Sequence, residues 1–219
     1  MRRLIIGGVF AVWAGLFAWA YVTNSEPQIE PRVVDLRISH KEDTVNESKS
    51  RKVRVQELKA GSACSGAFVS NNGDIITAAH CLRDAEEIMV RTYDNQVYKA
   101  TFVATATKHD LGLIHIDRQG TSFFQLANSV KRGEQIFILG SPLAIPNTLS
   151  TGIVAKLDGD RMLVDCSALP GNSGSTVFNA RGELVGVLVA GYIVGLGTTH
   201  LNVAQSVDSV RFFLKRTKL

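Results

Sequence analysis

Short apolar runs, many with a polar residue at every second position, recur along the chain from residue 51 onward. Runs of about four to eight residues with this pattern are typical of β-strands. Turn sequences such as Asn71-Asn72-Gly73 and Asp158-Gly159-Asp160 separate them. The pattern predicts an all-β protein with antiparallel sheets in a sandwich or barrel arrangement. We expect strands at Val53–Glu57, Ala67–Ser70, Asp74–Thr77, Glu87–Thr92, Val97–Ala104, Leu111–Ile116, Gln135–Leu139, Thr151–Lys156, Met162–Cys166, Ser175–Phe178, Leu184–Val189 and His200–Ala204.

Polar residues and a glycine interrupt the strand pattern near residues 126–133. The interruption divides the predicted strands into two halves of about six strands each. After the last strand, Val207, Val210, Phe213 and Leu214 have the spacing of one helix face. We therefore predict a C-terminal helix that follows two all-β halves.

The first 22 residues have a different pattern. Residues 4–22 contain no charged residue and follow Arg2 and Arg3. As a helix this run spans about 28 Å, enough to cross the hydrocarbon core of a bilayer. The preceding arginines predict a single-pass anchor with the rest of the chain outside the cytoplasm, in a periplasmic or extracellular space. The alternative is a cleaved signal peptide of a secreted protein, because Ala18-Trp19-Ala20 offers a small-x-small cleavage site.

Residues 23–50 are polar and of mixed charge, and Pro27 and Pro31 lie among them. This composition is typical of a linker between a membrane segment and a folded domain. The short alternating piece Val33–Ile38 could instead dock as an additional strand. The folded domain is expected to cover residues 51–219.

Composition narrows the class of protein further. Apolar residues make up 45% of the chain and charged residues 20%, a globular balance that excludes bulk disorder. The net charge of +4 equals the contribution of four basic residues near the C-terminus, Arg211, Lys215, Arg216 and Lys218. No basic stripe with interleaved aromatic residues accompanies them, so we expect no nucleic acid among the partners.

Gly171-Asn172-Ser173-Gly174 follows Pro170 and is the first candidate for chemistry. Two glycines around a serine permit a sharp turn that presents a hydroxyl and directs backbone N–H groups to one point. Acyl transfer requires both an attacking oxygen and donors for the charge that develops on the carbonyl. An ordinary glycine-rich loop is the alternative for this tetrapeptide alone.

His80 and Asp110 supply two further groups. His80 follows an apolar strand directly, and Asp110 precedes the strand Leu111–Ile116. Each has a structural alternative when taken singly: a hydrogen-bonded histidine at a strand end, or an aspartate that caps a turn. Their order with Ser173 along the chain nevertheless matches the His-Asp-Ser catalytic triad.

The motifs around these residues resemble the chymotrypsin-like serine peptidases, and the HtrA/Deg branch most closely. The resemblance covers roughly residues 61–205. It is carried by CSGAFVSNNGDIITAAHCL, TYDNQVYKATFVA, HDLGLIHID, KRGEQIFILGSPL, TLSTGIVAKL, VDCSALPGNSGS and FNARGELVGVLVA. It implies two six-stranded antiparallel β-barrels of the chymotrypsin type and no metal or organic cofactor.

The resemblance also implies a role for each matching residue. Ser173 is the expected nucleophile, His80 its base, and Asp110 the carboxylate that orients His80. The N–H groups of Gly171 and Ser173 would form the oxyanion hole. The segment Val189, Ala190 and Gly191 would pair with an extended substrate backbone.

Three departures from the family pattern limit what is carried over. Asn172 stands where trypsin-like zymogens have an aspartate, so we expect activity without a cut that creates a new N-terminus near residue 51. Ser175 replaces the last glycine of GNSGG, which leaves an inactive relative as an alternative. The chain ends at Leu219, where HtrA relatives continue into a PDZ domain, so we expect no PDZ-based substrate capture.

Specificity and cysteine pairing are also implied by the resemblance. Ser167 occupies the position of the pocket aspartate in trypsin, so cleavage after Arg or Lys is disfavoured. His200 could point into the same pocket and favour Glu or Gln, with a hydrogen-bonded strand histidine as the alternative. Cys64 and Cys81 are expected to form a disulfide and Cys166 to be buried. A zinc site of Cys64, His80 and Cys81 lacks a nearby fourth ligand.

The sequence thus predicts a membrane-tethered serine endopeptidase that cleaves extended or unfolded polypeptide through an acyl-enzyme on Ser173. The alternative is a catalytically inactive binding or adaptor protein of the same fold at the membrane. A lipase or esterase is disfavoured, because the Ser-Asp-His order of α/β-hydrolases is absent. Nothing in the sequence indicates the oligomeric state.

Overall fold

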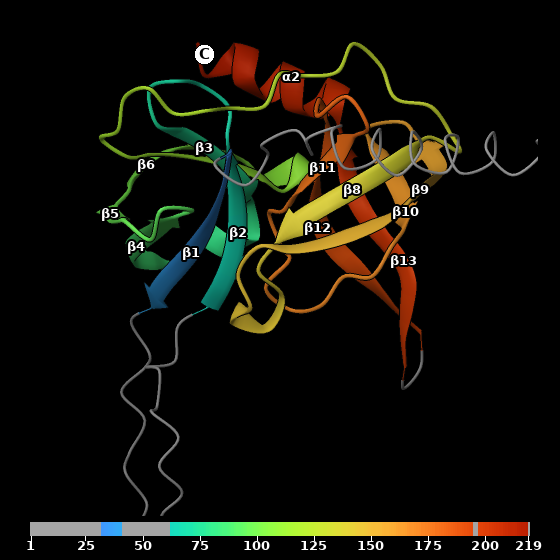
Figure 1. The fold of residues 1–219 in the computed structure, drawn as a ribbon, viewed down its shortest axis with the longest axis horizontal. Coiled ribbons are helices and arrows are strands. Elements are labelled where there is room, and N and C mark those ends of the chain that lie inside the picture. Colours follow the sequence, from blue (N-terminus) through green and yellow to red (C-terminus); the bar gives the residue numbers. More distant parts are fainter. Residues whose placement is uncertain (1–31, 41–61, 195–196, 219) are drawn as a thin grey trace, which may run out of the picture.

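The chain folds into two β-lobes with one helix packed where they meet (Figure 1). The computed structural model describes residues 32–40, 62–194 and 197–218. The strands of the first lobe are β1 (Val33–His40), β2 (Ser62–Phe68), β3 (Asp74–Ala78), β4 (Ala85–Thr92), β5 (Val97–Lys99), β6 (Thr101–Ala106) and β7 (Leu111–His115). Those of the second are β8 (Gln135–Gly140), β9 (Thr148–Asp158), β10 (Arg161–Asp165), β11 (Thr176–Asn179), β12 (Leu184–Val194) and β13 (Gly197–Ser206), followed by helix α2 (Val207–Arg216).

The second lobe is a closed barrel with the strand order β10-β13-β12-β11-β8-β9. Every neighbouring pair in it is antiparallel. Burial alternates along its strands: in β10, Met162 and Val164 are buried, whereas Arg161 and Asp165 are exposed. This alternation is the period-two pattern from which the strands were predicted. The six-stranded barrel is confirmed for this lobe.

The first lobe is a seven-stranded sheet with the order β5-β4-β1-β2-β3-β7-β6. Its two outermost strands, β5 and β6, are consecutive in the chain and separated only by Ala100. The sheet therefore curls until its two edges meet at this residue. The single strand predicted at Val97–Ala104 is divided there, because the chain bonds to β4 as far as Ala100 and pairs with β7 from Thr101 onward. The all-β, two-lobed fold class holds, with one more strand in the first lobe than expected.

Strand β1 corrects the predicted linker. Residues 23–50 were expected to connect the membrane segment to a domain that begins at residue 51, yet Val33–His40 is a central strand of the first lobe. It pairs with β2 on one side and β4 on the other. Its apolar residues Val34, Leu36 and Ile38 are buried in the core of that lobe. The alternation in Val33–Ile38 thus marks a strand, and the folded domain begins before residue 51.

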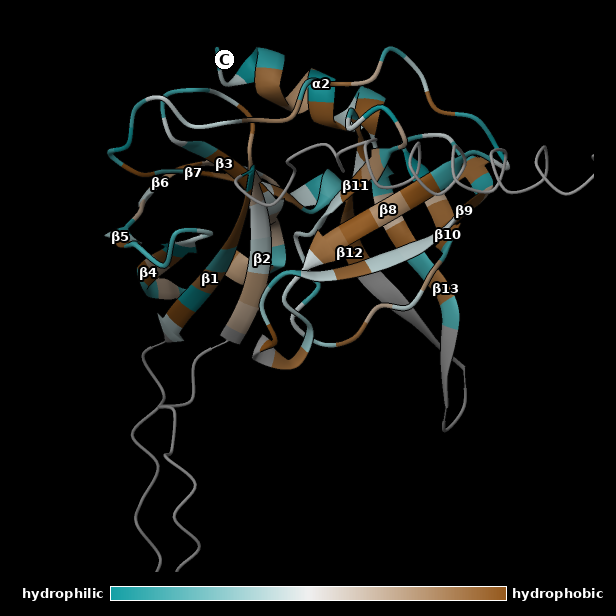
Figure 2. Ribbon diagram, viewed as in Figure 1, coloured by the Kyte–Doolittle hydropathy of each residue, from teal (hydrophilic) through white to brown (hydrophobic). Residues whose placement is uncertain are grey.

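A shared core joins the two lobes and the helix. On the helix it contains Val207, Val210, Phe213 and Leu214, which confirms the predicted apolar face. The lobes contribute residues from both sheets, among them Leu111 of β7 and Phe178 of β11. Figure 2 shows the brown, apolar side of α2 turned toward the strands. Burial of this face fixes how the lobes sit relative to each other, and the site described below lies between them.

Several predictions concern residues outside those described, including the anchor or signal segment at residues 1–22 and the strand Val53–Glu57. Within residues 32–40, 62–194 and 197–218, no helix combines the length and apolar character needed to cross a bilayer.

Candidate active site

His80 and Asp110 are brought together by the pairing of two neighbouring strands. His80 lies in the 3₁₀ turn η2 (Ala79–Leu82), which follows β3 directly, and Asp110 precedes β7. Antiparallel pairing matches the end of β3 with the start of β7, Ala78 opposite Leu111. The N–H of Ala79 then donates to the carbonyl of Asp110 at 3.0 Å. Strand register alone therefore places the carboxylate beside the imidazole.

Both carboxylate oxygens of Asp110 bond to His80. Oδ2 lies 2.7 Å from the ring Nδ1, and Oδ1 accepts the backbone N–H of His80 at 2.8 Å. About a third of each side chain is exposed, 34% for His80 and 31% for Asp110. A carboxylate on Nδ1–H leaves Nε2 as the acceptor of the neutral ring. This is the tautomer that a general base requires.

The backbone of Asp110 supports this arrangement. The residue follows the 3₁₀ turn η3 (Thr107–His109) and has the left-handed conformation, with φ 49° and ψ 41°. Aspartate and asparagine tolerate this region better than most residues. The local turn thus favours a short polar residue at this position independently of any chemistry.

A disulfide fixes the histidine turn to the neighbouring strand. Cys64 of β2 and Cys81 of η2 are bonded, with their Cα atoms 6.4 Å apart, as the resemblance implied. Cys166 is a free, buried cysteine, and burial raises the pKa of its thiol to about 11. Ligand atoms of Cys64, His80 and Cys81 lie within 4.8 Å of one another. The two sulfur atoms are bonded to each other, however, so neither is available as the thiolate that zinc binds.

Two consecutive turns form the segment around Ser173. The N–H of Asn172 donates to the carbonyl of Leu169 at 3.0 Å, and that of Ser175 to the carbonyl of Asn172 at 2.9 Å. Gly171 and Gly174 have positive φ angles of 101° and 83°. A side chain at Gly174 would lie 2.1 Å from the carbonyl oxygen of Ser65 and 2.3 Å from Oγ1 of Thr77. Glycine is required here because this turn of the second lobe rests directly on β2 and β3 of the first.

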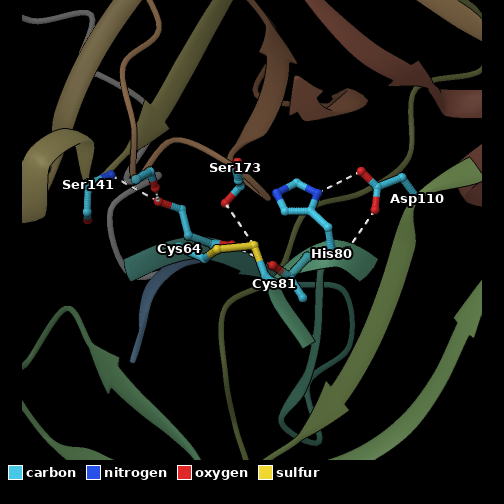
Figure 3. Close-up of a disulfide and its surroundings, with 9 residues drawn as sticks. Cys64, His80, Cys81, Asp110, Ser141 and Ser173 are labelled. Atoms are coloured by element: carbon cyan, nitrogen blue, oxygen red, sulfur yellow. Dashed lines mark hydrogen bonds and ion pairs between the residues drawn. A yellow bond between two sulfur atoms is a disulfide. The ribbon is translucent and has the colours of Figure 1, made fainter. Parts of the chain in front are cut away.

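Ser173 lies next to His80, and the imidazole lies between Ser173 and Asp110 (Figure 3). The carbonyl of Ser173 accepts the N–H of Ser65 at 2.8 Å. It also lies 4.0 Å from Sγ of Cys81, the contact dashed in Figure 3. A disulfide sulfur has no proton to donate, so this is packing and not a hydrogen bond. No hydrogen bond joins the Ser173 hydroxyl to His80 among the described residues; such bonds are often long before substrate binds.

The N–H groups expected in the oxyanion hole are not engaged elsewhere. Within the described part of the chain, neither Gly171 nor Ser173 donates its N–H to a protein acceptor. Their carbonyls, in contrast, are both held by Ser65, since the hydroxyl of Ser65 donates to the carbonyl of Gly171 at 2.9 Å. Both N–H groups therefore have no protein acceptor among the described residues.

Buried oxygen atoms without a partner lie behind the turn. Oδ1 of Asn172 and Oγ of Ser175 form no hydrogen bond with another described residue. A Cβ built on Gly140 would come within 2.0 Å of the Ser175 oxygen and 2.8 Å of the Asn172 oxygen. The serine that replaces the usual glycine is therefore accommodated because residue 140 has no side chain. The sequence shows Ser175 as a departure but gives no sign of its pairing with Gly140.

The residues expected to contact substrate lie in and beside the strands near the turn. Ser167 and His200 are exposed, and the carbonyl of His200 accepts the N–H of Cys166. Ala190 and Gly191 of β12 pair with β13, while on the other side the pairing with β11 ends at Val187. In the described residues no strand pairs with Val189–Gly191 on that side, and the side chain of Val189 is buried in the core of the first lobe.

Asn202 is a residue of this region that the sequence did not indicate. Its side chain is buried, and its Nδ2 donates to the carbonyls of Cys166 at 2.6 Å and His200 at 3.1 Å. It thereby connects β13 to the segment that precedes Ser167. A lone asparagine in a strand carries no sequence signal for such a role.

Comparison with known proteins identifies the family. The family model of the trypsin-like peptidase domain matches residues 64–187, more than half of the chain, including His80, Asp110 and Ser173. The chain belongs to the trypsin-like peptidase family. The match begins at the disulfide and ends in β12, so it spans both lobes of the trypsin-like peptidase domain.

Curated relatives carry the name probable periplasmic serine endoprotease DegP-like. The protein from Pseudomonas fluorescens is 32% identical over 163 residues, 70% of this chain and 34% of its own length. The protein from Pseudomonas savastanoi is 34% identical over 133 residues, 56% of this chain and 28% of its own. The chain therefore spans about a third of the length of these relatives. The HtrA/Deg-like trypsin-like peptidase predicted from the motifs is confirmed at the level of family.

A solved structure shares the fold. The serine endoprotease from Yersinia pestis superposes with a TM-score of 0.71 at 21% identity, over 86% of this chain and 63% of that one. At this identity the likeness establishes the chymotrypsin-like fold of the trypsin-like peptidase domain.

Proposed function

We propose that this protein is a serine endopeptidase that hydrolyses peptide bonds through an acyl-enzyme on Ser173. The observation that carries the proposal is the orientation of His80: Asp110 holds its Nδ1, and the imidazole lies beside Ser173. In the reaction, His80 takes the proton of the Ser173 hydroxyl and later gives it to the leaving amine. The N–H groups of Gly171 and Ser173 stabilise the oxyanion. The relatives named as serine endoproteases support the same chemistry.

Extended or unfolded segments of polypeptide are the proposed substrates. Because no described strand pairs with Val189–Gly191 on its β11 side, its backbone is the proposed partner of a chain in the β conformation, which a folded protein rarely exposes. Ser167 places no carboxylate in the expected pocket, so small or medium apolar side chains are favoured over Arg and Lys at the cleaved position. His200 remains a candidate for recognising Glu or Gln in that pocket.

The proposed setting is extracytoplasmic, with residues 1–22 as a membrane anchor. The charge-free run that follows Arg2 and Arg3 supports the anchor. The periplasmic relatives support the compartment. A structural disulfide also fits an oxidising space.

Labelling with a fluorophosphonate and cleavage of an unfolded protein test the proposal together. Wild type is expected to react with the probe and to degrade a reduced, unfolded substrate, whereas Ser173→Ala does neither. Circular dichroism must show both proteins folded. Folded wild type that neither reacts nor cleaves would support the inactive adaptor instead.

A further inference from the structure

Ser65 is fully buried in β2, and every one of its polar atoms is hydrogen-bonded. Its hydroxyl donates to the carbonyl of Gly171 at 2.9 Å and accepts the N–H of Ser141 at 3.0 Å. Its own N–H donates to the carbonyl of Ser173 at 2.8 Å, and its carbonyl accepts Oγ1 of Thr77 at 2.8 Å. One residue of the first lobe thus holds the nucleophile turn of the second lobe at two points.

The two points are the carbonyls of Gly171 and Ser173, whose N–H groups form the proposed oxyanion hole. Glycine rotates more freely about its backbone angles than any other residue. Gly171 would therefore lose the direction of its N–H most readily if its carbonyl were released. The hydroxyl of Ser65 is the only side-chain group in the described structure that holds this carbonyl.

A chain of contacts extends from Ser65 to strand β1. The hydroxyl of Ser141, which follows β8, donates to Oδ1 of Asp35. Oδ2 of Asp35 accepts Nε of Arg91, from β4, at 3.0 Å. Ser141 is buried, and the side chain of Asp35 is 15% exposed, so little water competes for these bonds. Strand β1, which was expected to belong to the linker, is therefore connected to the Ser173 turn through Ser141 and Ser65.

We propose that Ser65 is a positioning residue of the oxyanion hole, and that Asp35 supports it through Ser141. This inference rests on the proposed peptidase function, because the hole matters only if Ser173 reacts. Ser65 touches no substrate; it acts by fixing the turn that does.

Ser65→Ala, compared with Thr121→Val, tests the role. Thr121 is also a buried residue of the first lobe, and its hydroxyl forms one hydrogen bond, to the carbonyl of Ser70 at 2.7 Å. Asp110 precedes β7, whereas Thr121 follows it and so lies away from the site. Three measurements are made on each variant: steady-state kinetics (kcat and KM) on a peptide amide, the affinity for a peptidyl aldehyde, and hydrogen exchange of the backbone N–H groups within residues 169–176. Ser65→Gly is a second variant that leaves space for a water molecule on the Ser141 N–H if the alanine variant does not fold.

Loss of the Ser65 hydroxyl is expected to lower kcat by about tenfold to a hundredfold with KM nearly unchanged, since the donors remain but are misplaced. The aldehyde, which forms an oxyanion on binding, should lose affinity by a similar factor. Exchange across residues 169–176 should accelerate. Thr121→Val should move none of the three. Values for Ser65→Ala that equal those of Thr121→Val would overturn the proposal.

Hydrogen exchange distinguishes failure of this inference from failure of the proposed function, because it does not require an active enzyme. If wild type is inactive, the peptidase function fails. Faster hydrogen exchange in Ser65→Ala than in wild type then still establishes the positioning role, and unchanged exchange refutes it.

The Asp35 step is tested by Ser141→Ala alone and combined with Ser65→Ala. If the support passes through Ser65, Ser141→Ala lowers kcat in wild type but has no effect in the Ser65→Ala background. Equal losses in both backgrounds would overturn that step.

Discussion

The two halves of the candidate site are held by different means. The half with His80 and Asp110 belongs to the first lobe and is fixed within it by strand register, by two hydrogen bonds and by the disulfide on the histidine turn. The half with Ser173 belongs to the second lobe, where the N–H of Gly174 donates to the carbonyl of Leu188 at 2.8 Å, and it is also held by Ser65 of the first lobe. One half is locally determined, and the other also depends on contact between lobes.

This difference indicates which part of the site is more sensitive to distant changes. We expect a perturbation of the shared core around α2 to affect the bonds between His80 and Asp110 least, because both residues come from neighbouring strands of one lobe. The same perturbation shifts the Ser173 turn relative to His80, since that turn contacts β2 and β3 across the junction. The alignment of Ser173 with His80 in this protein is therefore a property of the lobe interface.

The largest loss of activity is expected from a substitution that removes the orienting carboxylate of the first half and leaves the backbone of both halves in place. In Asp110→Asn the amide tolerates the left-handed backbone and can still accept the N–H of His80. It no longer holds His80 in the required tautomer, so kcat should fall by about 10⁴. Thermal unfolding is expected near the wild-type temperature. A loss of less than about tenfold in kcat would show that Asp110 does not orient the base.

Removing the disulfide releases the first half from covalent restraint. Cys64 and Cys81 are 17 residues apart, and opening a loop of this size should lower the free energy of unfolding by about 3 kcal/mol. Urea denaturation of the double variant Cys64→Ser/Cys81→Ser measures the loss. Cys166→Ala is the matched control, because that cysteine closes no loop. A double variant as stable as this control would contradict the expectation.

A smaller effect is expected from overpacking behind the second half. In Gly140→Ala the new methyl would lie 2.0 Å from Oγ of Ser175, which should cost about 1–3 kcal/mol in stability and displace the turn. Ser175→Gly in the same background removes that oxygen and should restore most of the stability. Additive losses in the double variant, measured by urea denaturation, would show that the two positions do not share this space.

The smallest effect is expected at an ion pair of the first lobe that takes no part in the site. Hydrogen bonds from Arg118 and then Thr92 hold the pKa of Asp94 well below its ordinary value. A lowered pKa stabilises the fold above the ordinary pKa of about 3.9, and this contribution disappears as the pH falls below it. Because Asp94 is half exposed, Asp94→Asn should cost no more than about 0.5 kcal/mol at pH 7.

The difference between Asp94→Asn and wild type should shrink as the pH falls below about 3.9, because Asp94 then takes up a proton in the unfolded state while it stays ionised in the folded state. Activity at pH 7 should not change. A difference in unfolding free energy that grows on acidification would reverse the assigned sign.

The sequence predicts the locally determined half best. His80 and Asp110 each adjoin an apolar strand that is recognisable from its pattern, and antiparallel pairing then brings them together. The apolar face of α2 was predictable for the same reason, since a helix displays its period directly. The disulfide followed from resemblance to the family.

Features that depend on long-range packing could not be predicted. Ser65 bonds to Ser141 and Gly171, which are 76 and 106 residues away, and a single serine gives no sign of such partners. The fit of Ser175 against Gly140 exists only once β8 lies beside β11. Strand β1 was uncertain because its alternating residues lie between polar segments, and only the pairing with β2 and β4 identifies it as a central strand.

The most direct test of the account is the crystal structure of wild type after reaction with a peptidyl phosphonate. We expect a covalent bond between phosphorus and Oγ of Ser173, with His80 still bonded to Asp110. We also expect a phosphoryl oxygen about 2.7–3.1 Å from the N–H groups of both Gly171 and Ser173. Phosphorus bonded to another residue, or a phosphoryl oxygen directed away from both N–H groups, would contradict it.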